Sequence, residues 1–258
     1  MNKVWLIIRK EWLEIRQQYM LWGGMLVVPL VFVIVGGAGL ADPLSGNFHG
    51  LPMPDLSSNP QLANLSQAQL AQLVIGLQLR MIFLLLPLMI SAIIPAHSIV
   101  GEKNSRTLEP LLATPISSAQ LLLGKCLIAL VLSTVLSWLS GILFAVEGVI
   151  FTDPMIAGLI ASPGWLIALF LVVPGMALVP IAISVFVSSR VTDPRAAQQF
   201  SSLIGLVLAV VFYVLLGMAV ATPVTAVLAV VGFGLLGALS LYLATRLFRR
   251  EVILTRWN

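Results

Sequence analysis

The sequence predicts an all-α membrane protein with six transmembrane helices, and two observations carry this prediction. First, 59% of the 258 residues are hydrophobic and only 9% are Asp, Glu, Lys or Arg. Second, the apolar residues gather into runs of 20 or more, and about 20 helical residues cross a hydrocarbon core roughly 30 Å thick. Because little sequence remains for a soluble domain, we expect residues 1–258 to form one membrane domain. The six predicted spans are Leu21–Leu40, Met81–Val100, Leu121–Gly148, Trp165–Val187, Phe200–Ala221 and Val224–Thr245.

The distribution of positive charge predicts the orientation of these spans. Six spans place both termini on one side, and that side holds every Lys and Arg except Arg80. Lys and Arg gather on the cytoplasmic side of membrane proteins. We therefore expect a multi-pass protein of the plasma membrane (the inner membrane of a prokaryotic cell) with cytoplasmic N and C termini. The same asymmetry accounts for the pI of about 9.6 without a nucleic-acid-binding surface.

Residues 1–20 have the pattern of an amphipathic helix. Aromatic and aliphatic residues recur at steps of three and four, and charged residues occupy the rest of the helix. This pattern predicts an interfacial helix that contacts lipid on the cytoplasmic surface, and a solvated tail is the alternative. The apolar face comprises Trp5, Ile8, Trp12, Ile15 and Tyr19, and the charged residues are Arg9, Lys10, Glu14 and Arg16.

An extracellular segment, residues 41–79, is expected after the first span. It starts with turn residues such as Asp42-Pro43 and Asn59-Pro60. It continues as an uncharged amphipathic helix that we expect to rest on the outer leaflet or to cap the spans. One side of this helix carries Leu62, Leu65, Leu73 and Leu77.

Two features of the later spans bear on function. Prolines lie within the second and fourth spans, where they kink helices; kinks beside a transport pathway and ordinary packing irregularities both fit. The third apolar run is longer than one crossing requires. We expect Lys125 to extend to the cytoplasmic interface and Glu147 to reach the external one.

A polar island, Gly101 to Lys125, lies between long apolar runs, and residues 101–118 are its first part. Glu102, Arg106 and Glu109 are spaced i, i+4 and i+7, so the arginine can pair with either carboxylate. Leu108, Leu111 and Leu112 form an apolar patch beside them. Thr114-Pro115 ends this helix, and Ser117 or Ser118 can cap the next one. The pattern predicts a short cytoplasmic helix that fits a groove on a partner protein; a surface helix that only connects two spans is the alternative.

Several motifs of enzymes and cofactor sites fail on context. Gly232 to Gly237 fits G-x-G-x-x-G, but it lies within a predicted span, where small residues serve close helix packing. Gly124-Lys125 lacks the remaining residues of a phosphate-binding loop. The sequence contains neither an H-E-x-x-H nor a G-x-S-x-G motif. We therefore expect no catalytic residue, no cofactor, no metal ligand and no nucleic acid partner for this chain.

The polar island resembles the signature of type-2 ABC transporter permeases. The similar elements are Glu102-Lys103, Thr107-Leu108-Glu109, Leu111-Leu112, Thr114-Pro115 and Gly124-Lys125. The amphipathic leader, the six spans and the cytoplasmic termini are also similar, so the resemblance covers the whole chain. One departure is Arg106, where many members have glycine before the Thr-Leu-Glu.

The resemblance implies the permease subunit of an ATP-driven exporter, not itself an enzyme. Such a permease pairs with a second permease chain, here expected as a homodimer, and binds a separate cytoplasmic ATPase that carries the ATP and Mg²⁺. The substrate class would be a lipid, drug, peptide or similar amphipathic compound. Residues 1–20 would be the connecting helix and 101–118 the coupling helix, with contacts to the ATPase from Glu102, Arg106, Thr107, Leu108, Glu109, Leu111, Leu112, Thr114 and Pro115.

Two other functions remain open from the sequence. One is a self-sufficient channel or secondary carrier with no ATPase partner. It is weakened because every charge has an expected interface within reach and no internal repeat is evident. The other is a membrane scaffold with no transport.

Overall fold

The computed structural model describes residues 3–44, 65–105, 117–188, 190, 191 and 193–219, and seven single residues between 231 and 242. All regular structure in these ranges is helical. The fold class predicted from composition is therefore confirmed for the described part of the chain. The helices are α1 (Lys3–Gln17), α2 (Tyr19–Ala41), α3 (Gln67–Ile90), α4 (Ile93–Asn104), α6 (Ser118–Phe151), α7 (Pro154–Ile160), α8 (Pro163–Ser188) and α9 (Pro194–Ala219).

Four stretches of helix within the described residues are long and apolar enough to cross a membrane. They coincide with the first four predicted spans. The fifth predicted span falls on α9, whereas most of the sixth lies outside the described residues. The four stretches are Tyr19–Ala41, Gln67–Asn104, Ala119–Phe151 and Pro154–Ser188.

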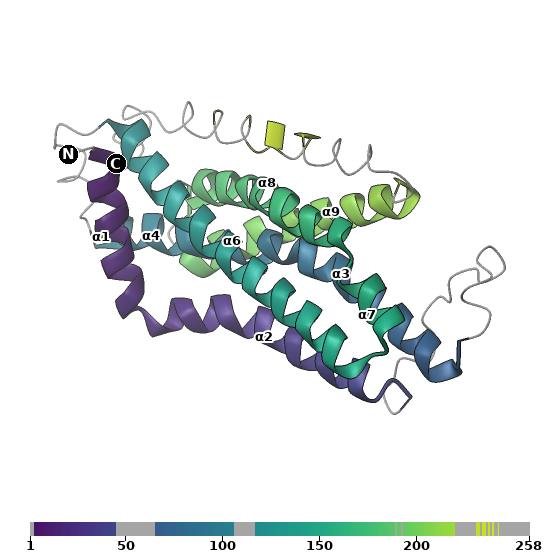
Figure 1. Cartoon of the computed structure of the whole chain (residues 1–258). Helices are drawn as coiled ribbons and strands as arrows, with labels where there is room; N and C mark the ends of the chain where they lie inside the picture. The colour runs from purple at the N-terminus through teal and green to yellow at the C-terminus, as the bar shows by residue number, and fades with distance from the viewer. Residues whose placement is uncertain are drawn as a thin grey trace.

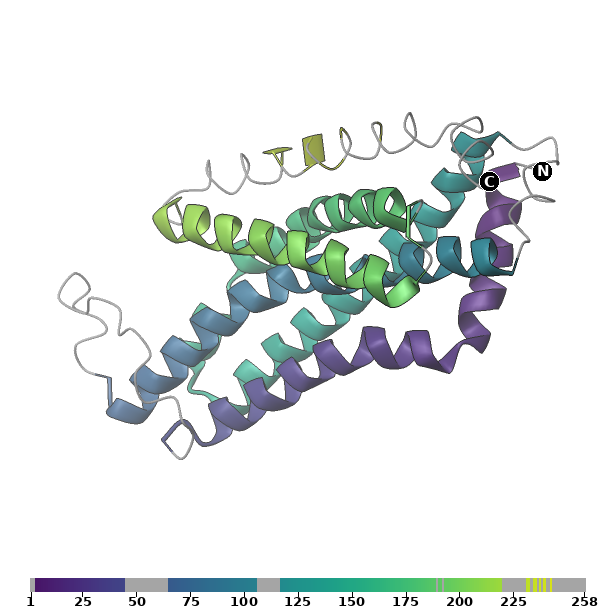
Figure 2. The ribbon, with the colours of Figure 1, turned by 180° about the vertical axis from the view of Figure 1, so that it is seen from behind.

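The long helices form a bundle, and α1 lies across one end of it (Figure 1). Helices α2, α3, α6, α8 and α9 run alongside one another, while α1 turns sharply away from α2. A single non-helical residue, Gln18, makes this turn with φ −98° and ψ 85°. Seen from behind, α4 reaches the same end of the bundle as α1 (Figure 2). We call the opposite end, where α2 and α6 finish, the distal end.

The amphipathic segment expected before the second span and the start of that span form one continuous helix. Helix α3 starts at Gln67 and continues without interruption through Ile90, so the amphipathic segment is the first part of that helix. Ser66 and Gln69 form a capping box that fixes this start. Leu73 is buried, and the polar residue Gln72 donates to the carbonyls of Leu40 and Phe151. This segment therefore joins α3 to the ends of α2 and α6.

Close helix contacts occur where glycine exposes the backbone. At Gly205 of α9, a Cβ atom would lie 3.0 Å from the carbonyl oxygen of Leu88 in α3. At Gly237, a Cβ atom would lie 2.5 Å from Cβ of Leu178 in α8, so this member of the G-x-G-x-x-G pattern serves helix packing. Gly232 and Gly234 have open space at the same position. The structure thus uses these two glycines for packing within one chain.

The second span contains a break at Ser91 and Ala92, between α3 and α4. Pro95 has no N–H, so it cannot donate to the carbonyl of Ser91 four residues before it. The hydroxyl of Ser184 in α8 donates to the carbonyl of Ala92 at 2.8 Å. This carbonyl also accepts from the N–H of Ala96 at 3.2 Å, so Ser184 adds a second hydrogen bond that ties α8 to the backbone at the break. Beyond this break, α4 leads toward the polar island.

Candidate functional site

Helix α1 is attached to the bundle by a face different from the predicted one. Ile7, Glu11 and Ile15 are each at most 4% exposed and point into the protein. Of the predicted apolar face, Ile15 is buried, whereas Trp5 is 60% and Tyr19 87% exposed. Trp5 and Trp12 therefore lie on the flank of α1, beside the buried face, whereas Tyr19 is the first residue of α2. This flank stays available for the lipid contact that the sequence predicts.

Gly124 allows α1 to approach α6 closely. A Cβ atom at this position would lie 2.6 Å from Cγ2 of Ile7, closer than real Cβ contacts come. Any larger residue would push α1 away. The contact places Lys125, the next residue of α6, beside Glu11 of α1.

Five polar side chains at this contact form a buried ion cluster: Lys10, Glu11, Ser98, Glu102 and Lys125. The ammonium of Lys125 lies 2.6 Å from Glu11 Oε1 and 2.9 Å from Glu102 Oε2. Lys125 and Glu11 are each 1% exposed. On the outer side of the cluster, Lys10 lies 2.5 Å from Glu102 Oε1. A buried lysine with two carboxylates is the paired arrangement that burial of charge requires.

Ser98 completes the cluster from α4. Its hydroxyl accepts a hydrogen bond from Lys125 at 2.5 Å and donates one to Glu11 Oε2 at 2.7 Å. One side chain thus satisfies both members of the central ion pair. Since Glu11 belongs to α1, Ser98 and Glu102 to α4, and Lys125 to α6, the cluster ties three helices together.

The charges of the cluster shift the pKa values of its two α1 members. Burial alone would raise the pKa of Glu11, but the charge of Lys125 and the hydrogen bonds from Lys125 and Ser98 outweigh burial and lower it. Burial alone would lower the pKa of Lys10, but the hydrogen bond and charge of Glu102 outweigh it and raise the value. Both shifts favour the charged forms, so the folded state holds Lys10 and Glu11 ionised at neutral pH.

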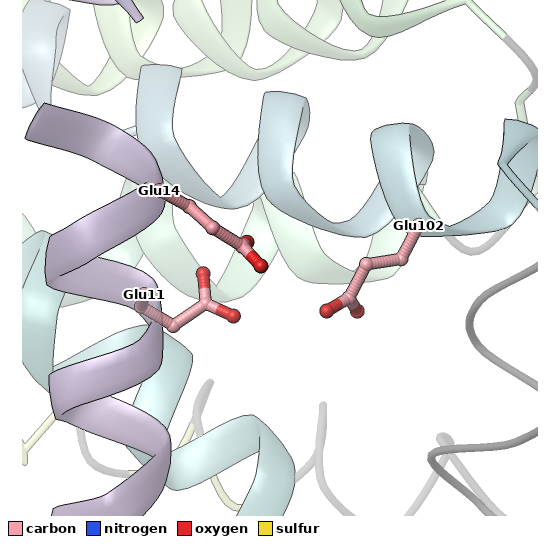
Figure 3. Close-up of side chains that lie close together, drawn as sticks. All are labelled: Glu11, Glu14 and Glu102. Atoms are coloured by element: carbon pink, nitrogen blue, oxygen red, sulfur yellow. The ribbon is translucent and has the colours of Figure 1, made fainter. Parts of the chain in front are cut away.

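Three carboxylates of this region point toward one another, Glu11 and Glu14 from α1 and Glu102 from α4 (Figure 3). Oxygen atoms from all three lie within 4.8 Å of one another, a spacing that a metal ion could use. The Lys10 ammonium already contacts all three, at 3.6 Å from Glu11, 3.0 Å from Glu14 and 2.5 Å from Glu102. The cation that these carboxylates share is therefore an ammonium of the chain itself.

The outward side of α1 is also shaped for contact. An open hollow of about 450 Å³ runs along it, with exposed leucines between charged groups. Lys10 belongs both to this hollow and to the ion cluster, and is 36% exposed. The hollow is lined by Leu6, Arg9, Lys10, Leu13, Glu14 and Gln17.

Of the nine residues predicted to contact an ATPase, the structure places Glu102, in the ion cluster. The other eight, between Arg106 and Pro115, lie outside the described residues. Just after them, Ser117 forms a capping box with Gln120 and starts α6, which confirms the expected cap. The polar island thus includes the end of α4 and the start of α6, and both helices contribute to the ion cluster.

The expectation for Lys125 is wrong, because it pairs with Glu11 and Glu102 instead of extending to an interface. Sequence reasoning also missed Glu11 and Ser98. A signal for Glu11 was available: it lies four residues from both Ile7 and Ile15, so it shares their buried face. A glutamate on an apolar face needs a cation nearby. Nothing local marks Ser98, whose role depends on α1 and α6.

A comparison with protein families identifies this chain. No curated protein matches it. A family model described as "ABC-2 family transporter protein" matches residues 5–249, which include most of α1, the whole ion cluster and all six predicted spans. The apolar helices and the match over nearly the full length agree with the resemblance seen at the polar island. The chain belongs to the ABC-2 transporter family and is a membrane-spanning ABC transporter permease.

Proposed function

We propose that this permease exports an amphipathic compound with energy from a separate cytoplasmic ATPase, and that the ion cluster carries motion from that ATPase into the membrane helices. The observation that carries the proposal is the position of the cluster. Its members lie on α1, on α4, which ends within the polar island, and on α6, which starts within it. A push on the island therefore reaches α1, α4 and α6 together.

The contacts of the cluster support a rigid connection. Glu102 lies three residues before Ser105, the residue that caps the C-terminus of α4. Its carboxylate oxygens lie 2.5 Å from the Lys10 ammonium and 2.9 Å from the Lys125 ammonium. Short charge-assisted contacts between buried groups fix the relative positions of the helices more firmly than surface ion pairs do. Movement of Glu102 pulls on α1 through Lys10 and on α6 through Lys125.

The partner surface in this proposal has two parts. The first is the predicted coupling helix, with Glu102, Arg106, Thr107, Leu108, Glu109, Leu111, Leu112, Thr114 and Pro115 as its residues. The second is the outward hollow of α1, where Leu6 and Leu13 offer apolar contact and Lys10 leads to the cluster. In the assembly, two copies of the permease bind two ATPase subunits on the cytoplasmic side, where both termini also lie.

The test is purification of the tagged chain in mild detergent from its native membranes, followed by identification of bound proteins and an assay of ATP hydrolysis. We expect a stoichiometric ATPase. Glu109→Lys is expected to lose the ATPase or to uncouple its hydrolysis from transport. Arg16→Ala, an exposed change on α1 outside the ion cluster, is the matched control and should keep both.

Transport of substrate by the purified chain in liposomes with no ATPase and no ATP would overturn the proposal. That result would support the self-sufficient channel or carrier instead. Transport at the wild-type rate by Glu109→Lys, at equal expression, would remove that residue from the coupling site.

A further inference from the structure

The distal end of the bundle contains a carboxyl group that the proposed coupling mechanism does not use. Glu147 lies on α6, four residues before the helix finishes at Phe151. Its Oε2 atom is buried and has no hydrogen-bond partner in the described part of the protein. An ionisable group in a membrane helix is costly unless it has a partner or a function.

One glycine of α2 makes room for this carboxyl group. A Cβ atom at Gly37 would lie 2.8 Å from Glu147 Oε1, so a larger residue there would shift the carboxyl group. At the preceding residue, Gly36, a Cβ atom would lie 3.2 Å from the ring of Phe144, one turn before Glu147 on α6. The Glu147 side chain is thus turned toward α2 near the end of α6.

A cationic residue of the distal end, Arg80 of α3, is engaged elsewhere. It donates to the carbonyl of Leu159 and the hydroxyl of Ser162, and its guanidinium lies 5.6 Å from the ring centre of Trp165. The carboxylate of Asp153 at this end accepts a hydrogen bond from Gln69. In contrast, the buried Oε2 of Glu147 has no hydrogen-bond partner among the described residues.

The surface around Glu147 is apolar and open. Leu143 and Ile150, about one turn to either side on α6, are 49% and 66% exposed, and Ile34 on α2 is 67% exposed. A ligand that satisfies the carboxylate here would therefore also contact hydrocarbon side chains. The chemistry that fits both is a positively charged nitrogen attached to an apolar body.

We propose that Glu147, seated on Gly37 at the α2–α6 contact, binds the ammonium group of an amphiphilic organic cation. As a statement about the exported compound, this inference rests on the proposed export function. As a statement about binding, it concerns the permease chain alone. Two sources carry the same chemistry, a transported lipophilic amine and the amino headgroup of a bilayer lipid.

Binding is tested with the full chain in nanodiscs of phosphatidylglycerol, without any ATPase. The probe is a diphenylhexatriene that carries a trimethylammonium group, and uncharged diphenylhexatriene is its matched control. Energy transfer from tryptophan to each probe gives the saturable binding above lipid partition. We expect Glu147→Gln to weaken binding of the cationic probe about tenfold, or about 1.4 kcal/mol, because the trimethylammonium group loses the Coulomb attraction of the carboxylate. Binding of the uncharged probe should not change.

Two further variants keep the test sharp. Asp153→Asn removes another carboxylate of the distal end, one that is paired with Gln69, and should leave binding unchanged. Gly37→Ala displaces the Glu147 carboxyl group without removing it and should weaken binding of the cationic probe. Equal thermal stability of these variants in detergent shows that each is folded.

The outcomes separate the sources and the alternatives. Competition by phosphatidylethanolamine in the nanodisc assigns the site to a lipid amine, and competition by dodecylamine alone assigns it to a free amphiphile. Unchanged binding in Glu147→Gln overturns the proposal, as does an equal loss for both probes. An altered oligomeric state with unchanged binding also overturns it and assigns Glu147 to a contact between chains. None of these results bears on the ATPase, so loss of ATPase association remains a separate test of the export function.

Discussion

The two ends of the bundle treat buried charge in opposite ways. At the α1 end, Lys125 and Glu11 are almost fully buried, and each has a charged partner and a hydroxyl within 2.7 Å. At the distal end, Glu147 has a buried carboxyl oxygen with no partner in the described part of the chain. Paired charge holds helices together, whereas an unpaired charge is available to a ligand. The comparison therefore separates a structural role from a binding role by the partners of each group, and it can be tested by removing either.

The largest effect is expected from Lys125→Ala. Two buried carboxylates would lose their shared cation, and breaking a buried ion pair from one side costs about 3–5 kcal/mol. We expect a matching loss in the free energy of unfolding of the purified chain, measured by denaturant titration in detergent. Arg16→Ala, exposed on α1, is the control and should change stability by less than about 0.5 kcal/mol. Equal stability of the two variants would mean that the ion cluster does not hold α1 in place.

An intermediate effect is expected from acid. The folded state lowers the pKa of Glu11 below its ordinary value of 4.5, so its ion pair stabilises the fold fully above that value. This contribution is lost as the pH falls through the lower folded-state pKa. Melting temperature should therefore drop below pH 4.5, and Glu11→Gln should flatten the drop while being less stable at neutral pH. An identical pH profile for the two proteins would contradict the role of Glu11.

The smallest effect on stability is expected from Glu147→Leu. Replacing an unpartnered carboxyl group by a side chain of similar size removes a desolvation cost and breaks no contact, so stability should stay equal or rise by up to about 1 kcal/mol. The same denaturant titration measures it. A loss as large as that of Lys125→Ala would erase the difference between the two ends and point to an internal partner for Glu147.

The sequence allowed the apolar helices to be placed because their signal is local. Runs such as Leu21–Leu40 and Trp165–Val187 are recognisable one window at a time, and α2 and α8 contain them. The signals of the capping boxes at Ser117 and Ser66 are likewise local, because each box depends only on the serine and the next three residues. The start of α3 was misplaced since its first turns carry glutamines, which resemble a surface segment until Gln72 is seen to bind α2 and α6.

Only part of the candidate site could be predicted, because most of its signal is not local in the sequence. Glu102 stands in a recognisable motif, and family resemblance points to it. Its partners come from distant parts of the chain, and no periodicity brings Lys10 or Lys125 to it. The aromatic residues of α1 also dominated the predicted face, although Ile7 and Glu11 form the contact. A helical wheel reveals an apolar stripe within one helix. It cannot show that a charged residue is buried, because the neutralising residue lies on another helix.

The distance along the chain between the partners of the ion cluster has a consequence for biosynthesis. Glu11 and Lys125 are 114 residues apart, so Glu11 leaves the ribosome long before its cation exists. Until α6 is made and inserted, α1 carries an acidic residue on the face that will become buried, and this face has no reason to settle against the bundle. Closure of the cluster thus marks the moment when the first three predicted spans have assembled in the right order. A chain that fails at this step leaves Lys125 without the carboxylate of Glu11.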